Sequence, residues 1–229
     1  MHPKMNNFYI RGIASNLVAL LLIVACLFLP AGTWNYWQAW VFIVVFELSA
    51  QSYGIYFLIH DRKLLERRMN IGPTAEKVPA QKIIATLFML GFIAVFMFPA
   101  FDHRFGWSPV PASVSVIGNA LIVLSFIFFF LVMKANSYAA STIQVEEGQP
   151  VISTGLYALV RHPMYSGCLV LLAGVPLALG SWWGLLLIVL FIPVLVWRLI
   201  DEEKFLHNNL PGYTTYTQKV RYRLIPYVW

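Results

Sequence analysis

The sequence predicts an all-α fold, a polytopic helical bundle embedded in a membrane. Of its 229 residues, 59% are hydrophobic and only 11% are charged, and the mean hydropathy is +0.70. Soluble domains carry about 25% charged residues, so this composition excludes an ordinary soluble domain. Mostly apolar windows recur along the chain, and a helix needs about 20 such residues to cross a bilayer. We therefore expect an integral membrane protein with about six transmembrane helices.

Six apolar windows define the expected membrane helices. They cover residues 13–30, 36–59, 83–100, 112–133, 164–180 and 182–200. The last two windows are short and are joined by "GSWWG", so they predict a tight helical hairpin. We divide the chain into four N-terminal membrane helices over residues 1–133 and a C-terminal region over residues 134–229. The second region contains a polar loop, the hairpin and a tail.

The distribution of basic residues predicts the orientation in the membrane. With the N-terminus inside, six helices place the loops at residues 60–82 and 134–162, and the tail from residue 201, in the cytosol. Fifteen of the 16 Lys and Arg residues fall on that side or at its boundary, and Arg104 falls on the other. Because cytosolic loops are enriched in Lys and Arg, we expect both termini and the active site to be cytosolic. The membrane would be the inner membrane of a bacterium or the endoplasmic reticulum of a eukaryote.

Composition and motif content also limit which binding partners and metal sites are expected. Basic residues next to membrane helices face anionic lipid headgroups, which accounts for the net charge of +6 without nucleic acid. Cys26 and Cys168 lie inside expected membrane helices and predict no disulfide framework. The sequence contains no zinc-ligand spacing, P-loop or G-x-G-x-x-G, so no metal site is expected. It does not indicate the oligomeric state.

One carboxylate falls inside an expected membrane helix. Glu47 lies near the bilayer centre, and Gln51 follows one turn later on the same helical face. An intramembrane carboxylate is costly and usually faces a bundle interior or a cavity. Two roles stay open: Glu47 joins helices through polar contacts, or it lines a substrate path.

A polar loop and a short basic motif precede the hairpin on the expected cytosolic side. The loop covers residues 136–160, and the motif "RHPMY" follows it directly. Proline is favoured at the first helical position, so the fifth membrane helix is expected to begin at Pro163. His162 then takes the cap position and Tyr165 lies in the first turn. The N–H groups and the dipole of such a helix start suit an anionic group such as a carboxylate.

A second polar motif, "WRLIDEEKFL", lies at the exit of the last expected helix. Arg198 and Glu202 are about 40° apart on one helical face, whereas Glu203 is rotated about 140° from Arg198. The pair could be a simple ion pair on a solvated helix. A short hairpin, however, brings the start of one helix close to the end of the other. We therefore expect His162, Tyr165, Arg198 and Glu202 to meet at one membrane–cytosol corner.

These motifs resemble those of the isoprenylcysteine carboxyl methyltransferase family. The resemblance rests on "GLYALVRHPMYSG", "RLIDEE", "GYTTY" and the final "YRLIPYVW". It covers roughly residues 134–229, whereas residues 1–133 match only as hydrophobic helices. Members of the family are integral membrane methyltransferases that use S-adenosylmethionine, so the resemblance implies that cofactor here.

The resemblance also implies roles for individual residues. The implied cofactor-binding residues are Gln149, Pro150, Val151, Ile152, Tyr157, His162, Pro163, Met164, Tyr165 and Glu202, with Thr142 or Gln144 as a further polar contact from the loop. Arg198 is implied to contact the substrate. The residue types suit the chemical groups of the cofactor. His162 at a helix start suits the carboxylate, and Glu202 suits a cation or the ribose hydroxyls. The ring of Tyr157 suits the sulfonium.

The expected function is methyl transfer to a lipophilic or membrane-associated acceptor, with the carboxylate of an isoprenylcysteine-like, prenylated compound implied by the resemblance. This chain is shorter than eukaryotic members, which leaves the acceptor open. Alternatives are a phospholipid N-methyltransferase, a thiol S-methyltransferase, and an NADPH-dependent membrane reductase of the sterol-reductase type, which carries a similar H-P-x-Y-like block. A transporter or scaffold is less favoured, because the chain shows no internal repeat.

Overall fold

The structure, a computed structural model, describes residues 3–69 and 71–229, and over these residues it is entirely helical and irregular. Residues 1, 2 and 70, which belong to the expected N-terminal region, lie outside the described residues. The elements are α1 (Pro3–Ala31), α2 (Trp37–His60), α3 (Arg62–Met69), α4 (Pro79–Phe105), α5 (Ala112–Ala135), the 3₁₀ turn η1 (Gly155–Ala158), α6 (Pro163–Ala178), the 3₁₀ turn η2 (Trp183–Leu185), α7 (Leu186–Asn209) and α8 (Tyr213–Lys219). The predicted all-α class is confirmed.

Among the residues that the structure describes, five helices are long and apolar enough to cross a membrane: α1, α2, α4, α5 and α7. The chain is therefore an integral membrane protein. The fifth expected window does form a helix, α6, but this helix has only 16 residues. At a rise of about 1.5 Å per residue it is about 24 Å long, less than the roughly 30 Å hydrocarbon core of a bilayer.

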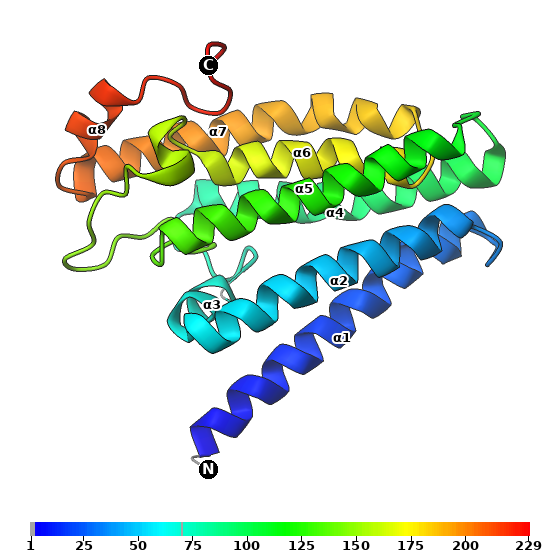
Figure 1. Cartoon of the computed structure of the whole chain (residues 1–229), viewed down its shortest axis with the longest axis horizontal. Coiled ribbons are helices and arrows are strands. Elements are labelled where there is room, and N and C mark those ends of the chain that lie inside the picture. Colours follow the sequence, from blue (N-terminus) through cyan, green and yellow to red (C-terminus); the bar gives the residue numbers. More distant parts are fainter. Residues whose placement is uncertain (1–2, 70) are drawn as a thin grey trace.

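Helices α4 to α7 run side by side, whereas α1 and α2 lie along one side of this group (Figure 1). Glycines allow α5 and α6 to approach closely. A Cβ atom at Gly118 would lie 2.1 Å from the backbone nitrogen of Ala178, and one at Gly174 would lie 3.1 Å from the carbonyl oxygen of Gly118. Backbone therefore packs against backbone here, which fixes α6 relative to α5.

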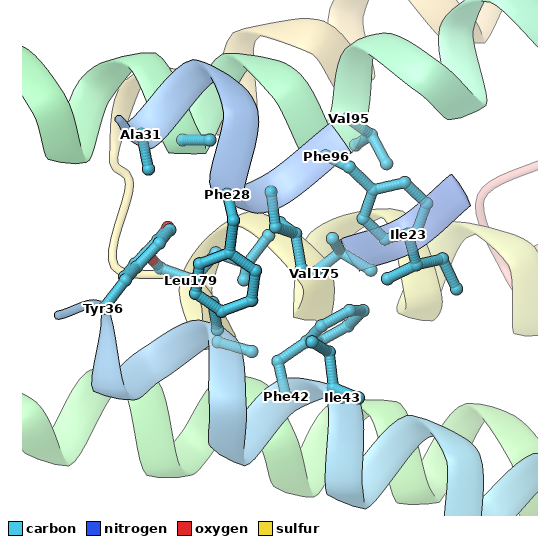
Figure 2. Packing of buried hydrophobic residues seen from close by; sticks show 14 of the residues in the cluster. Ile23, Phe28, Ala31, Tyr36, Phe42, Ile43, Val95, Phe96, Val175 and Leu179 are labelled. Atoms are coloured by element: carbon cyan, nitrogen blue, oxygen red, sulfur yellow. The ribbon is translucent and has the colours of Figure 1, made fainter. Parts of the chain in front are cut away.

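The main apolar core lies at the end of the bundle where α1 and α6 finish and α2 begins (Figure 2). Phe28, Phe42 and Phe96 contribute rings from three different helices. The hydroxyl of Tyr36 is buried in this core and donates a hydrogen bond of 2.6 Å to the carbonyl oxygen of Leu179. This packing joins α2 to the end of α6. The polar residues of the expected site are left at the opposite end of the bundle.

Glu47 joins helices in the structure. Its Oε2 atom accepts hydrogen bonds from the amides of Asn16 on α1, at 3.4 Å, and of Gln51, at 3.1 Å. The predicted shared face of Glu47 and Gln51 is confirmed, and the contacts favour the helix-joining role over a substrate path.

Candidate active site

The start of α6 has the predicted form. Pro163 is the first helical residue and His162 is the cap residue. The backbone N–H of Tyr165 donates to the carbonyl oxygen of His162 at 3.0 Å. The rings of His162 and Tyr165 lie 5.7 Å apart between centroids. The R-H-P-M-Y motif thus holds two aromatic side chains at one helix end.

The end of α7 meets the start of α6, as the hairpin predicts. The hydroxyl of Tyr165 donates a hydrogen bond of 2.6 Å to Oε2 of Glu202. The apolar window of the last helix ends at residue 200, but α7 continues to Asn209, so the helical placement of Glu202 is confirmed. Within "DEEKFL", the Glu, Lys and Leu residues are good helix formers that extend it, and Leu206 packs against the cluster around α8. Glu202 therefore lies on regular helix, which fixes the direction of its side chain.

Arg198 is buried, with 6% of its surface exposed. Its Nη1 atom donates to Oε1 of Glu76 at 2.9 Å and also to the side-chain oxygen of Gln81. Its Nη2 atom donates to the carbonyl oxygen of Ser141 at 3.2 Å. The interpretation of Arg198 and Glu202 as a solvated ion pair is thus wrong. Sequence reasoning missed the contacts of Arg198 with Glu76 and Gln81, because both residues lie more than 100 positions away from it in the chain.

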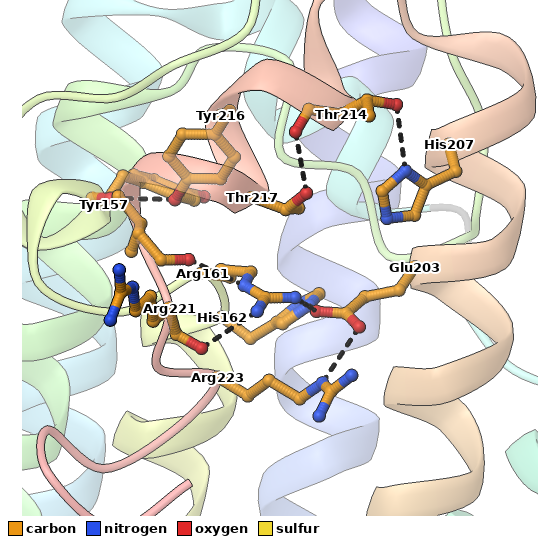
Figure 3. A network of polar contacts seen from close by, with 11 residues as sticks. Tyr157, Arg161, His162, Glu203, His207, Thr214, Tyr216, Thr217, Arg221 and Arg223 are labelled. Atoms are coloured by element: carbon orange, nitrogen blue, oxygen red, sulfur yellow. Dashed lines mark hydrogen bonds and ion pairs between the residues drawn. The ribbon is translucent and has the colours of Figure 1, made fainter.

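Glu203 is the centre of a buried ion cluster (Figure 3). Its Oε1 atom lies 2.8 Å from Nη1 of Arg161 and 3.3 Å from Nε2 of His162, and its Oε2 atom lies 2.9 Å from Nε of Arg223. The helical-wheel argument placed Glu203 away from Arg198 and gave it no role. That argument could not find the cluster, because Arg223 comes from the tail, which folds back over this side of α7.

The tail is pinned to the R-H-P motif by backbone hydrogen bonds. The N–H of Arg161 donates to the carbonyl oxygen of Tyr222 at 2.9 Å, and that of His162 donates to the carbonyl oxygen of Arg223 at 3.0 Å. The hydroxyl of Ser166 donates to the carbonyl oxygen of Leu224 at 2.6 Å. The tail therefore closes one side of the corner formed by α6 and α7.

Tyr157 forms the wall of the corner that comes from the polar loop. Its hydroxyl accepts a hydrogen bond of 3.1 Å from the amide of Asn136, and its carbonyl oxygen accepts one of 2.7 Å from the hydroxyl of Tyr216. Burial is the main cause that raises the pKa of Tyr157 to about 12; the bond from Asn136 opposes the rise, and the nearby charge of Glu202 adds to it. Tyr157 is therefore neutral at neutral pH and lies close to Glu202.

A cavity of about 390 Å³ opens between the polar loop and the end of α7. Its volume lies in the range of about 300–1,000 Å³ that is typical of ligand pockets. The lining residues are Val145, Glu146, Glu147, Gly148, Gln149, Phe205, Asn209 and Pro211. Of the predicted loop residues, Gln149 lines this cavity and Val151 packs against the cluster around α8. Pro150 is exposed, while Thr142 and Ile152 are half-buried.

Helix α3, which the sequence reading left inside a loop, braces the polar loop. Nε and Nη2 of Arg67 lie 2.5 and 2.7 Å from the two carboxylate oxygens of Glu146. This bidentate hydrogen bonding is the first cause that lowers the pKa of Glu146. Arg68 donates to the carbonyl oxygen of Ala140 at 3.2 Å. Helix α3, from the N-terminal half of the chain, thus positions the polar loop that is expected to bind the cofactor.

The predicted residues fall into two zones. Tyr157, His162, Tyr165, Arg198 and Glu202 gather at the corner between α6 and α7. Residues 149–152 lie further out, against the end of α7 and α8. Within the described part of the chain no hydrogen bond joins residues 149–152 to Tyr165 or Glu202. Pro163 and Met164 contribute to the corner through packing: Pro163 is buried, and Met164 packs near Met133.

Comparison with protein families identifies one similar family model. A model described as phospholipid methyltransferase matches residues 114–211, which is less than half of the chain. The matched segment runs from α5 to the end of α7 and contains the predicted site residues. No curated protein matches the chain. Together with the membrane fold, the match supports the class of integral membrane methyltransferases. The match does not identify an isoprenylcysteine as the methyl acceptor.

Proposed function

We propose that this protein is an S-adenosylmethionine-dependent membrane methyltransferase that acts on a lipophilic acceptor at the cytosolic face. The observation that carries the proposal is the overlap of two independent features. The segment that resembles the phospholipid methyltransferase model is also the segment that builds the corner around Tyr165 and Glu202. That corner lies at the ends of apolar helices, where a lipid acceptor would present its headgroup.

The residues at the corner fit the cofactor by their chemistry. Oε2 of Glu202 is engaged by Tyr165, which leaves its second oxygen for a cation or a hydroxyl of the ligand. The neutral ring of Tyr157 suits a positive sulfonium. When bound, S-adenosylmethionine supplies a methyl group that is already activated. The chain then has to align donor and acceptor and exclude water more than it has to supply a strong base.

Two acceptor classes remain in the proposal. The motifs of the tail and the R-H-P block favour an isoprenylcysteine-like carboxylate. The description of the matched family model favours the amine of a phospholipid headgroup. In both cases a lipophilic body would lie among the apolar side chains of the membrane helices. The reductase alternative is weaker, because the family model that matches the segment with the site describes a methyltransferase.

A binding titration tests the proposal. Purified protein in detergent is titrated by calorimetry with S-adenosylhomocysteine, the product of the cofactor, and separately with NADPH. We expect saturable binding of S-adenosylhomocysteine without added metal and no binding of NADPH. The opposite pattern would support the reductase and contradict methyl transfer.

A further inference from the structure

The connector between α3 and α4, residues 71–78, sends one acidic side chain into the site. Glu76 is 8% exposed, whereas Ile71 and Val78 at the two ends of the connector are 74% and 53% exposed. The carboxylate of Glu76 lies 2.9 Å from Nη1 of Arg198. A surface connector thus supplies the buried carboxylate partner of Arg198, the arginine that the family resemblance implies to contact the acceptor.

The contacts of Arg198 leave little of its planar end free for an acceptor. Both terminal nitrogens are engaged, Nη1 by Glu76 and Gln81 and Nη2 by the carbonyl oxygen of Ser141. Of these partners, Glu76 is the only one that carries a formal charge. Gln81 belongs to α4, and the hydroxyl of Ser141 donates a hydrogen bond to the carbonyl oxygen of Arg68. Glu76 instead lies on an irregular connector that is partly exposed. Glu76 is therefore the partner that can leave at the lowest cost in packing.

The charges of the corner determine what can replace Glu76. The amide of Gln81 donates to Asp201, and Glu202 is held by Tyr165. Both carboxylates stay in place when the connector moves. A carboxylate or a phosphodiester that replaces Glu76 at Arg198 therefore leaves the total charge of the corner unchanged, and a phosphate monoester adds at most one further negative charge. The guanidinium fork also matches the geometry of these groups. An amine would gain nothing from the departure of Glu76.

We propose that Glu76 is a specificity-determining residue: it occupies the anion position at Arg198 while the acceptor is absent, and an anionic headgroup displaces it. The inference rests on the proposed function and on the contact with the acceptor that the family resemblance implies for Arg198. Glu76 then acts as an internal competitor that only a group able to pair with Arg198 can replace. Neutral and cationic amphiphiles leave the connector closed.

Hydrogen exchange of the connector tests this displacement. Wild-type protein in maltoside micelles is mixed with dodecanoate, dodecyl phosphate or dodecylamine, and exchange is measured on peptides that cover residues 71–78. We expect faster exchange with dodecanoate or dodecyl phosphate and no change with dodecylamine. The amphiphile that acts at the lower concentration distinguishes a carboxylate acceptor from a phosphate-bearing one. Unchanged exchange with both anions, or opening by the amine, overturns the proposal.

The variant Glu76→Gln gives a second, independent measurement. It keeps a hydrogen-bonding side chain but removes the competing charge, so half-maximal exchange should need several-fold less anionic amphiphile. Glu66→Gln, which alters an exposed acid of α3, serves as the control and should behave like wild type. If Glu76 is only a structural tether, Glu76→Gln binds the anion no more tightly than wild type. Titration with S-adenosylhomocysteine separates the two ideas: its binding with no displacement overturns the role of Glu76 alone, and its failure to bind wild type overturns the proposed function.

Discussion

Neighbouring glutamates at the end of α7 have different surroundings. Glu202 accepts a hydrogen bond from Tyr165 at one oxygen, and its other oxygen is the one proposed to bind the cofactor. Glu203 is 6% exposed and is engaged through both oxygens by Arg161, His162 and Arg223. Because its oxygens are already used, Glu203 acts on the site through position: it fixes the tail against the R-H-P motif.

Removal of the charge of Glu203 should release the tail. A buried carboxylate that is lost from an ion cluster leaves its cationic partners uncompensated, which costs about 3–5 kcal/mol. We expect Glu203→Gln to lower the thermal unfolding temperature in detergent and to speed protease cleavage between residues 217 and 224. Glu66→Gln is the matched control, because its exposed ion pair contributes little. Equal stability of the two variants would show that the cluster does not hold the tail.

At the residue scale, the sequence predicted the positions of those side chains that depend on local helical structure. Pro163 specifies its own place at a helix start, so the cap position of His162 followed correctly. The meeting of Tyr165 and Glu202 followed from the hairpin. Glu76 and Glu203 could not be found in this way. Their burial depends on the connector and the tail folding over the site, and helical periodicity carries no information about that.

At the scale of elements, the contact between α5 and α6 positions the site. The two helices touch through backbone at Gly118 and Ala178, so α6 can neither rotate nor move away without loss of this contact. The hydroxyl of Ser125 adds a hydrogen bond of 2.9 Å to the carbonyl oxygen of Gly167. The start of α6, and with it His162 and Tyr165, is thereby fixed relative to the loop that follows α5.

A methyl group at Gly118 should separate the two helices. Its Cβ atom would lie 2.1 Å from a backbone nitrogen, and backbone cannot rotate away as a side chain can. Overpacking of this kind costs typically about 1–3 kcal/mol. We expect Gly118→Ala to lower the thermal unfolding temperature in detergent. Gly54→Ala on α2 is the control, since a Cβ there meets nothing within 4 Å. A stable Gly118→Ala variant would contradict the tight packing of α5 on α6.

Hydrophobic windows predicted the existence of the long helices but not all their limits. The windows detect apolar residues, so they stopped at residue 200 although α7 continues through polar ones. They also passed over α3, whose sequence "RKLLERRM" is too charged to register. A signal was present, because Arg62 and Glu66 form an i,i+4 ion pair and Leu64 is fully buried.

At the scale of the whole molecule, the two ends of the bundle are chemically different. One end carries the apolar core around Phe28, Phe42 and Phe96 (Figure 2). The other end carries the ion cluster (Figure 3) and the corner at Glu202. Composition alone predicted the membrane class. The 15-to-1 division of basic residues predicts which end is cytosolic, and this orientation stays a prediction. The acceptor could not be predicted from the residues alone, because Arg198 is the one motif residue that the resemblance implies to contact it.

The central claim is that the corner between α6 and α7 binds the methyl donor through Glu202. Calorimetric titration with S-adenosylhomocysteine of wild type, Glu202→Gln and the control Glu66→Gln tests it most directly. Loss of a charge-assisted hydrogen bond costs about 1.5–3 kcal/mol, which is a roughly ten- to hundredfold weaker affinity. The account predicts this loss for Glu202→Gln and wild-type affinity for Glu66→Gln, with both variants folded. Wild-type affinity in Glu202→Gln would place the cofactor elsewhere and contradict the account.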